Sequence, residues 1–444
     1  MDAAVQPRVA ASGRHRAQAA RRTISAHQPS RGLPPAHQDL RRRLRGVRPV
    51  STLAVSPVAP MPDGASHAQS PTPSALDGAR ILFLSSHTTR GGTMDYIFTL
   101  RPRLQQLGAL VPVVALTRGG EHDPREIEAL TPGGGFGPWR YVRAVVRFFA
   151  VVRRQRPDLV VGVMPLANVL AGLAGLFGLT TAVATHHNPC ETHNRWLRLA
   201  DMMLGRAGAY GRIVCVSEAV RASFACHPAA YRRCLEVIGN GVAPAGEAGG
   251  RTATRQRFGL PLEGTLVLAV GRLSPVKNVL RVIAALAGIE GARLVLAGDG
   301  PIRDEAVALV SKLGLMDRVF FLGAVGKQDV TDLLHACDVF VQASLYEGHS
   351  LALLEAIRAQ SVMVVSAVPA QVEAVRLPDG SSAALLCDPE SESSIADAVR
   401  IAAFDSGRRQ HLRSQTRILA AAVQTEEAMF GSYAAVFSRL LVQR

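Results

Sequence analysis

Short apolar runs that alternate with helical stretches constrain the fold of this 444-residue chain more than any other feature. One series of runs covers residues 81–86, 111–117, 159–164, 180–185, 213–217 and 235–242, and a second covers 265–273, 292–300, 318–323, 338–344, 362–366 and 383–387. Strands of parallel sheets are apolar throughout, because helices cover both faces of the sheet. Strand–helix alternation also favours right-handed crossovers. The pattern therefore predicts an α/β protein with two Rossmann-like, doubly wound parallel sheets facing across a cleft.

The predicted domains follow from where the two series begin and end. Residues 1–78 are rich in Arg, Ala, Pro and Ser and lack apolar periodicity, which predicts a disordered basic extension. A targeting peptide, or a translation start placed upstream of a true start at Met61, would give the same composition. The remaining predicted parts are a first domain over 79–245, a linker over 246–264, a second domain over 265–425 and a closing helix over 426–444 packed across both domains.

The net charge of +15 has two sources. Residues 1–78 hold eleven Arg and four Asp, with no Lys or Glu, so they contribute 11 − 4 = +7, and the rest of the chain carries about +8. Without RGG repeats or zinc-finger spacing, this excess suits anionic ligands or a membrane surface better than nucleic acid. The six cysteines show no CxxC spacing, which favours buried free thiols and a cytoplasmic protein.

Residues 159–184 contain no charged side chain and are long enough to span a bilayer. They also contain four glycines, Pro165 and Asn168. The segment divides into a strand, a helix and a strand, so a buried βαβ unit is the favoured interpretation and a membrane span the alternative.

The stretch 139–156 predicts a basic amphipathic helix. Arg140, Arg143, Arg147 and Arg154 lie near one face, with Val142, Val145, Val146, Phe149 and Val152 opposite. Such a helix can bind an anionic membrane from the cytoplasmic side, which would suit a lipid-linked substrate. An ordinary domain helix with its apolar face on the sheet is the favoured interpretation, because that face is needed for packing, and the membrane-binding helix is the alternative.

Two glutamates follow the predicted strand at 338–343. Glu347 lies in the loop before a helix that starts near Ser350, and Glu355 lies within that helix. Carboxylates accept hydrogen bonds from vicinal hydroxyls, and a helix N-terminus favours an anion. This layout matches a sugar, a diphosphate and a ribose in series.

A pair of cations follows the strand at 265–270. Arg272 and Lys277 lie five residues apart in VGRLSPVKN, before a helix that starts near Asn278. Two cations at a strand end can hold a diphosphate and stabilise a departing phosphate. Taken alone, the pair is slightly better explained as surface charges.

The order of these motifs resembles a known family. GRLSPVKN, LAGDGP (296–301), VFFLG (319–323) and CDVFVQASLYEGHSLALLEA (337–356) resemble the donor domain of retaining glycosyltransferases of family 4, which have the GT-B fold. Looser matches upstream are Gly91-Gly92, THHN (185–188), CVSEAV (215–220) and NGV (240–242), so the resemblance covers about residues 80–440.

The resemblance implies transfer of a sugar from a nucleotide-diphosphate sugar to an acceptor hydroxyl, with retention of configuration, in polysaccharide, lipopolysaccharide or glycolipid biosynthesis. Arg272 and Lys277 would bind the donor diphosphate, Glu347 the transferred sugar and Glu355 the ribose. A histidine of THHN would lie near the reacting sugar, and His186 is preferred over His187. The resemblance further implies that backbone amides of Gly348, His349 and Ser350 meet the phosphates and that the Gly91-Gly92 loop approaches the donor from the first domain.

The chain departs from the family pattern at three places. His349-Ser350 replaces the usual Phe-Gly, Ala359-Gln360-Ser361-Val362 replaces a loop that usually has Gly and Pro, and Val368-Pro369-Ala370 replaces Gly-Gly. These changes put the donor sugar in question more than the fold.

The expected mechanism needs no cofactor and no metal, because cationic side chains can replace a divalent ion at the diphosphate. The acceptor would be a sugar, a lipid-linked molecule or a small molecule. A GT-B sugar-nucleotide epimerase, a phosphorylase and a non-catalytic sugar-nucleotide-binding relative are the competing hypotheses.

Overall fold

The computed structural model describes residues 75–88, 92–119, 127–132, 138–244, 246 and 248–443. The predicted disordered extension therefore falls outside the described residues, except for its last four positions. Of these, Leu76 is fully buried in the core of the first sheet.

The first sheet has seven parallel strands in the order β3-β2-β1-β4-β5-β6-β7. The strands are β1 (Ile81–His87), β2 (Val113–Thr117), β3 (Glu128–Ala129), β4 (Leu159–Val163), β5 (Thr181–His186), β6 (Tyr210–Cys215) and β7 (Leu235–Val237). The order reverses at β1, where β2 and β4 flank it. The C-terminal ends of these strands form the edge at which ligands bind in doubly wound sheets.

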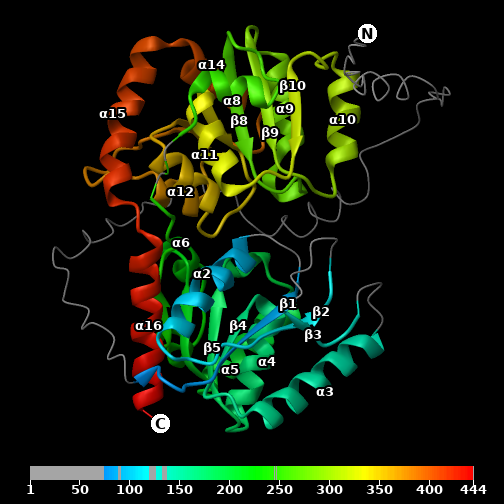
Figure 1. Cartoon of the computed structure of the whole chain (residues 1–444), viewed down its shortest axis with the longest axis vertical. Helices are drawn as coiled ribbons and strands as arrows, with labels where there is room; N and C mark the ends of the chain where they lie inside the picture. Colours follow the sequence, from blue (N-terminus) through cyan, green and yellow to red (C-terminus); the bar gives the residue numbers. More distant parts are fainter. Residues whose placement is uncertain are drawn as a thin grey trace, which may run out of the picture. The chain divides into compact units, whose positions relative to one another are not determined.

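Helices cover both faces of this sheet (Figure 1). The helices are α2 (Gly92–Gln106), α3 (Pro138–Gln155), α4 (Pro165–Leu176), α5 (Arg195–Arg206), α6 (Glu218–Ser223), α7 (Ala229–Arg233) and, from the end of the chain, α16 (Glu426–Val442). One core lies beneath α3, α4 and α5, and the other beneath α2 and α16. The uncharged stretch 159–184 is thus β4, α4 and β5, which confirms the buried βαβ interpretation, and none of the helices in the described part of the chain could cross a membrane.

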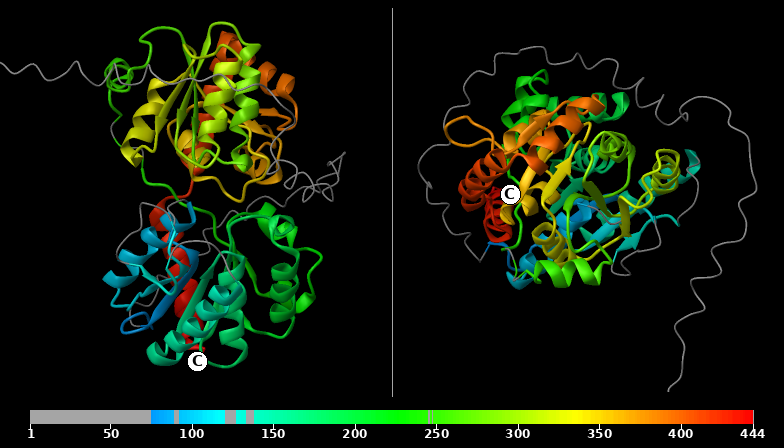
Figure 2. Two further views of the ribbon diagram at one scale, coloured as in Figure 1. Left: turned by 90° about the vertical axis from the view of Figure 1, so that its right-hand side faces the viewer. Right: turned by 90° about the horizontal axis from the view of Figure 1, so that it is seen from above.

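The second sheet has six parallel strands in the order β10-β9-β8-β11-β12-β13. They are β8 (Thr265–Val270), β9 (Ala292–Ala297), β10 (Val319–Gly323), β11 (Val339–Gln342), β12 (Val362–Ser366) and β13 (Leu385–Cys387). Its helices are α8 (Arg251–Arg257), α9 (Val279–Ala287), α10 (Arg303–Lys312), α11 (Lys327–Ala336), α12 (Leu351–Arg358), α13 (Pro369–Ala374), α14 (Glu392–Phe404) and α15 (Ser406–Ala422), which also lie on both faces (Figure 2). Two Rossmann-like sheets are therefore present, as the alternating pattern predicts.

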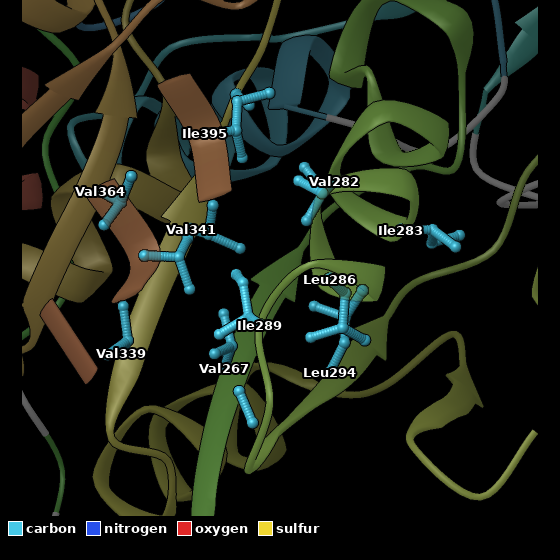
Figure 3. Packing of buried hydrophobic residues seen from close by; sticks show 14 of the residues in the cluster. Val267, Val282, Ile283, Leu286, Ile289, Leu294, Val339, Val341, Val364 and Ile395 are labelled. Carbon is cyan, nitrogen blue, oxygen red and sulfur yellow. The ribbon is translucent and has the colours of Figure 1, made fainter. Parts of the chain in front are cut away.

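Branched side chains fill the core on one face of the second sheet. Val267, Val339 and Val341 point from the strands toward Val282 and Leu286 of α9 (Figure 3). The three strand valines, Val267, Val339 and Val341, are each 1% exposed. β-Branched residues fit this setting because they lose little freedom in an extended strand.

The chain passes from the first sheet to the second near Val242 and returns at Thr425, where the two segments form a parallel bridge. Helix α16 then packs beside α2, with Tyr433 and Phe437 buried in the first sheet's core. At its start, Glu426 lies 3.2 Å from an Arg103 nitrogen and 3.7 Å from the Lys327 ammonium of α11. The last helix therefore packs against the first sheet, and its first residue also forms an ion pair with α11 of the second.

Helix α3 is rotated relative to the sequence prediction. Ala144, Phe148 and Val151 are buried against the first sheet, whereas Val142 and Val146 are 51% and 62% exposed. The predicted apolar face was thus partly wrong. These two valines lie on the outer face beside exposed Arg143. The face of α3 that packs on the sheet is instead formed by Ala144, Phe148 and Val151.

Candidate active site

A cavity of about 630 Å³ lies where the strand ends of the two sheets meet. Its lining from the first sheet's side includes His87, Gly92, Asp95, Tyr96, Met164, His187, Asn188 and Asn240, and from the second sheet's side Arg272, Lys277, Val325, Lys327, Glu347, Gly348, His349, Ser350 and Glu355. Every sequence-predicted site residue that the structure describes, except His186, is in this lining. Gly91 lies outside the described residues.

The two cations follow β8, as the sequence predicts. Lys277 ends a 3-10 turn (Pro275–Lys277), and Asn278 then takes a left-handed conformation with φ of 57° before α9 begins. The Asn278 side chain donates to the carbonyls of Ala343 (2.9 Å) and Pro389 (2.7 Å), which holds this conformation. The turn thereby brings Lys277 back over the end of β11.

Arg272 faces the first sheet across the cavity. Burial, together with the nearby Arg272 guanidinium, lowers the pKa of His87 below its usual value. His87 is therefore a neutral group at neutral pH. An anion placed between His87 and Arg272 would be held chiefly by Arg272 and Lys277.

Lys277 and Glu347 form a direct ion pair. The Lys277 Nζ lies 2.6 Å from Glu347 Oε1, and the Glu347 side chain is 11% exposed. The Gln342 amide, at the end of β11, donates to the same Oε1 at 3.0 Å. Both contacts thus fall on one carboxylate oxygen. The arrangement joins the cation that can meet a phosphate to the carboxylate that can meet a sugar hydroxyl.

Ser350 starts helix α12 at the floor of the cavity. Its hydroxyl accepts from the Leu353 N–H at 3.4 Å, which caps the helix, and accepts from the Gln342 amide at 2.9 Å. Gln342 therefore holds both Glu347 and the helix start. The free N–H groups of this helix end form a favourable site for an anion.

Glu355 lies one turn further along α12, where burial raises its pKa to about 7. Asp95 and Glu426 raise this pKa further by their negative charge, and Lys327 opposes them. Both protonation states of Glu355 are therefore accessible near neutral pH, and the protonated group can donate as well as accept a hydrogen bond.

Gly92 begins α2 and contributes to the cavity from the first sheet's side. A Cβ at this position would lie 3.7 Å from the Leu351 Cδ1 of α12. The starts of α2 and α12 are thus in contact across the cavity.

The structure corrects the preference between the two histidines of THHN. His186 is 1% exposed and is absent from the cavity lining; its Nε2 lies 2.9 Å from the Tyr231 hydroxyl, which donates to Asp201 at 2.5 Å. Burial lowers the pKa of His186 to about 3. Adjacent residues at a strand end face opposite sides of the sheet, and the cavity lies on the side of His187.

His187 lines the cavity as a neutral group. Burial lowers its pKa to about 4, and its Nε2 lies 3.1 Å from the Thr185 hydroxyl. Because that hydroxyl donates to the Gly162 carbonyl (2.9 Å), it accepts from His187, and His187 Nδ1 is left as an acceptor. The Tyr96 ring packs edge-on against His187, with centroids 5.1 Å apart.

Three contributors were missed by the sequence analysis. Gln342 could have been found from its position at the end of an apolar strand beside Glu347. Asn240 and Ser217, which bind the Glu347–Ser350 loop from the first sheet's side, lie in NGV and CVSEAV, but nothing in those motifs indicates the partner. Conversely, the family's usual glycine near position 360 has a structural reason, because Gln360 here takes a φ of 55°, in the left-handed region.

Two parallel, doubly wound sheets with a cavity at their strand ends are the architecture of the GT-B class of glycosyltransferase folds. A family model described as "Glycosyl transferases group 1" matches residues 250–418, and "Glycosyltransferase Family 4" matches residues 90–245. The chain belongs to the family-4 glycosyltransferases.

Individual relatives agree with this assignment. The chain is 32% identical over 161 residues to an uncharacterized glycosyltransferase of Methanocaldococcus jannaschii, and 34% identical over 144 residues to D-inositol 3-phosphate glycosyltransferase of Mycolicibacterium smegmatis. These matches cover 36% and 31% of this chain and span only 40% and 32% of the two relatives. The crystal structure of Anabaena Alr3699/HepE with UDP and glucose shares the fold, with a TM-score of 0.68 at 21% identity over 80% of this chain and 98% of that chain.

Proposed function

We propose that this protein transfers a sugar from a nucleotide-diphosphate sugar to an acceptor hydroxyl with retention of configuration. One observation carries the proposal: the Lys277–Glu347 ion pair joins a cation and a carboxylate directly before the N-terminus of α12. A donor laid along this line would place its diphosphate at Arg272, Lys277 and the helix end. Its sugar would lie at Glu347 and its ribose at Glu355.

In the proposed reaction, the bond between the sugar's anomeric carbon and the diphosphate oxygen breaks as negative charge builds on the diphosphate. Arg272, Lys277 and the α12 amides stabilise that charge without a metal ion. The acceptor hydroxyl attacks from the face that the diphosphate leaves, and a diphosphate oxygen takes its proton. Glu347, held by its contact with Lys277, orients the sugar by its hydroxyls.

His187 takes the role that the sequence analysis gave to His186. Its Nδ1 would accept a hydrogen bond from a hydroxyl of the transferred sugar, because its other nitrogen already donates to Thr185. At neutral pH it carries no charge. It therefore orients the sugar and does not act as an acid.

A uridine donor is the first to test, since the Anabaena protein that shares the fold was crystallised with UDP and glucose. A panel of UDP-, GDP- and ADP-sugars, scored by nucleotide release with and without acceptors, tests the activity. Retention is read from the anomeric configuration of the product by NMR. An epimerase would change the sugar of the donor without an acceptor, and a binding protein would give no turnover with any pair.

The acceptor we propose is presented at an anionic membrane on the cytoplasmic side, as in polysaccharide, lipopolysaccharide or glycolipid synthesis. Both tryptophans of the chain are exposed, Trp139 by 79% and Trp196 by 62%, on α3 and α5. Exposed Arg143 and Arg195 accompany them. We call the exposed residues of α3, α4 and α5 together the tryptophan face; besides the tryptophans, its large exposed hydrophobic residues are Tyr141, Val142, Val146, Leu176, Phe177, Leu199 and Met203. Tryptophan with arginine suits a lipid headgroup region.

A further inference from the structure

The loop that carries Glu347 is held by the first sheet's side of the protein at two successive residues. Ser217 donates from its hydroxyl to the Gly348 carbonyl at 2.8 Å. Asn240 donates from its backbone N–H to the His349 Nδ1 at 2.8 Å and from its side chain to the His349 carbonyl at 2.7 Å. The loop before α12 is thus bound by residues that follow β6 and β7.

The fit beneath this loop leaves little room. A Cβ added to Gly348 would lie 1.9 Å from the His187 carbonyl oxygen, so the loop backbone lies directly against the residue after β5. A Cβ added to Gly239 would lie 3.2 Å from the His349 ring. The loop therefore bears a fixed relationship to His187 as long as His349 stays in place.

The protonation state of His349 suits this role. Burial lowers its pKa to about 4, so the ring is neutral at neutral pH. Because Nδ1 accepts from Asn240, the single ring proton is on Nε2. Phenylalanine, which the family pattern usually has at this position, has no atom that could accept this hydrogen bond.

We propose that His349 is a positioning residue. Through its contact with Asn240 it holds the loop that carries Glu347 in place against the first sheet's side, and so aligns the bound sugar with His187. This inference rests on the proposed function. His349 acts through the loop, and its effect is on the geometry of the reacting complex. Loss of the contact lets the loop shift while the diphosphate contacts of Arg272 and Lys277 persist, so turnover falls more than donor affinity.

Two substitutions separate the hydrogen bond from packing. His349→Asn keeps an acceptor, because the asparagine Oδ1 occupies nearly the place of the histidine Nδ1. His349→Phe removes the acceptor and keeps a ring. We expect His349→Phe to lower kcat by about tenfold or more with a change in donor Kd below about threefold, and His349→Asn to stay within about threefold of wild type in both.

Binding of the donor and of UDP is measured by calorimetry, turnover by nucleotide release, and folding by thermal melts. Equal loss in both variants would reject the hydrogen bond in favour of packing, and wild-type turnover in His349→Phe would reject the role altogether. Asn240→Ala, which removes only the side-chain contact, should give an intermediate kcat; it supplies a second route if His349→Phe does not fold.

A readout independent of activity distinguishes this inference from the proposed function. In the ¹⁵N spectrum of histidine-labelled protein, the signal lost in His349→Asn should show an unprotonated Nδ1 and a protonated Nε2 at neutral pH. A protonated Nδ1 would overturn the inference even if sugar transfer were found. If the expected tautomer were found but the protein had no transferase activity, the loop contact would stand. Only the proposed function would then be rejected.

Discussion

The Lys277 ammonium and the Glu347 carboxylate lie 2.6 Å apart, although 70 residues separate them in the chain. The turn after β8 and the loop after β11 supply them, and these strands are neighbours in the second sheet. The pair is the point at which the proposed phosphate and sugar subsites meet. The opposite charges of the two groups stabilise each other.

Substituting either partner should nearly abolish turnover. Lys277→Ala and Glu347→Ala are each expected to lower kcat/KM by about 100-fold or more, since each removes one contact to the reacting sugar phosphate and leaves the other charge unpaired. Nucleotide release measures the effect. Exposed Lys312 and Glu263 offer matched controls as Lys312→Ala and Glu263→Ala. Wild-type rates in either site variant would show that the site is assigned wrongly.

The two adjacent histidines should respond differently to substitution. His187→Ala is expected to lower kcat by about tenfold or more with the donor still bound, because it removes a cavity acceptor. His186→Ala should chiefly lower the melting temperature, because it leaves Tyr231 and Asp201 with a buried polar network lacking one member. Exposed His411→Ala is the control. The opposite outcome, with His186 governing turnover at normal stability, would restore the preference drawn from the sequence.

The raised pKa of Glu355 predicts a pH effect on stability. The folded protein keeps this proton up to about pH 7, whereas the unfolded chain releases it near the ordinary glutamate pKa of 4.5. The folded state therefore binds more protons in this window, and the group's contribution to stability is lost as the pH rises through it. At pH 8, Glu355→Gln should raise the free energy of unfolding by on the order of 1 kcal/mol, and the difference should vanish near pH 5. Denaturant melts at the two pH values test this, and an equal difference at both would contradict the burial argument.

The tryptophan face predicts selective membrane binding. Wild-type protein should float with vesicles of phosphatidylglycerol and phosphatidylcholine but not with phosphatidylcholine alone. The double variant Trp139→Ser, Trp196→Ser should float several-fold less, whereas Ile418→Ser, which removes a 60% exposed apolar residue on α15, should not change it. Equal flotation with and without anionic lipid, or equal flotation of wild type and the double variant, would contradict the proposed membrane-presented acceptor. A concentration-dependent dimer lost in the double variant would assign the face to a second copy of the chain.

The sequence predicted the strands well, and for a physical reason. Apolar runs mark strands that are buried on both faces, and the residues just after them must lie at one edge, so Arg272 and Glu347 could be assigned to the same edge from the sequence alone. The choice between His186 and His187 could not, because it depends on which side of the first sheet the cavity lies.

Two other features were beyond the sequence for related reasons. His349 contacts Asn240, 109 residues earlier in the chain, and no local pattern encodes that partner. The rotation of α3 depends on how the helix meets the sheet. Val142 is as apolar as Val151, and only the packing decides which of them is buried.

The return of the chain at Thr425 has a consequence for how the protein is made. The core beneath α2 lacks Tyr433 and Phe437 until the second sheet has been synthesised. The first sheet therefore emerges from the ribosome with an apolar groove beside α2. Helix α16 can cover this groove only after some 180 further residues have been synthesised. An expressed fragment that stops after β7 would expose the same groove, so the part of the chain that forms the first sheet should not be isolable by cutting between the two sheets. In a circular permutant that begins with α16, this helix would be synthesised before the first sheet that it covers.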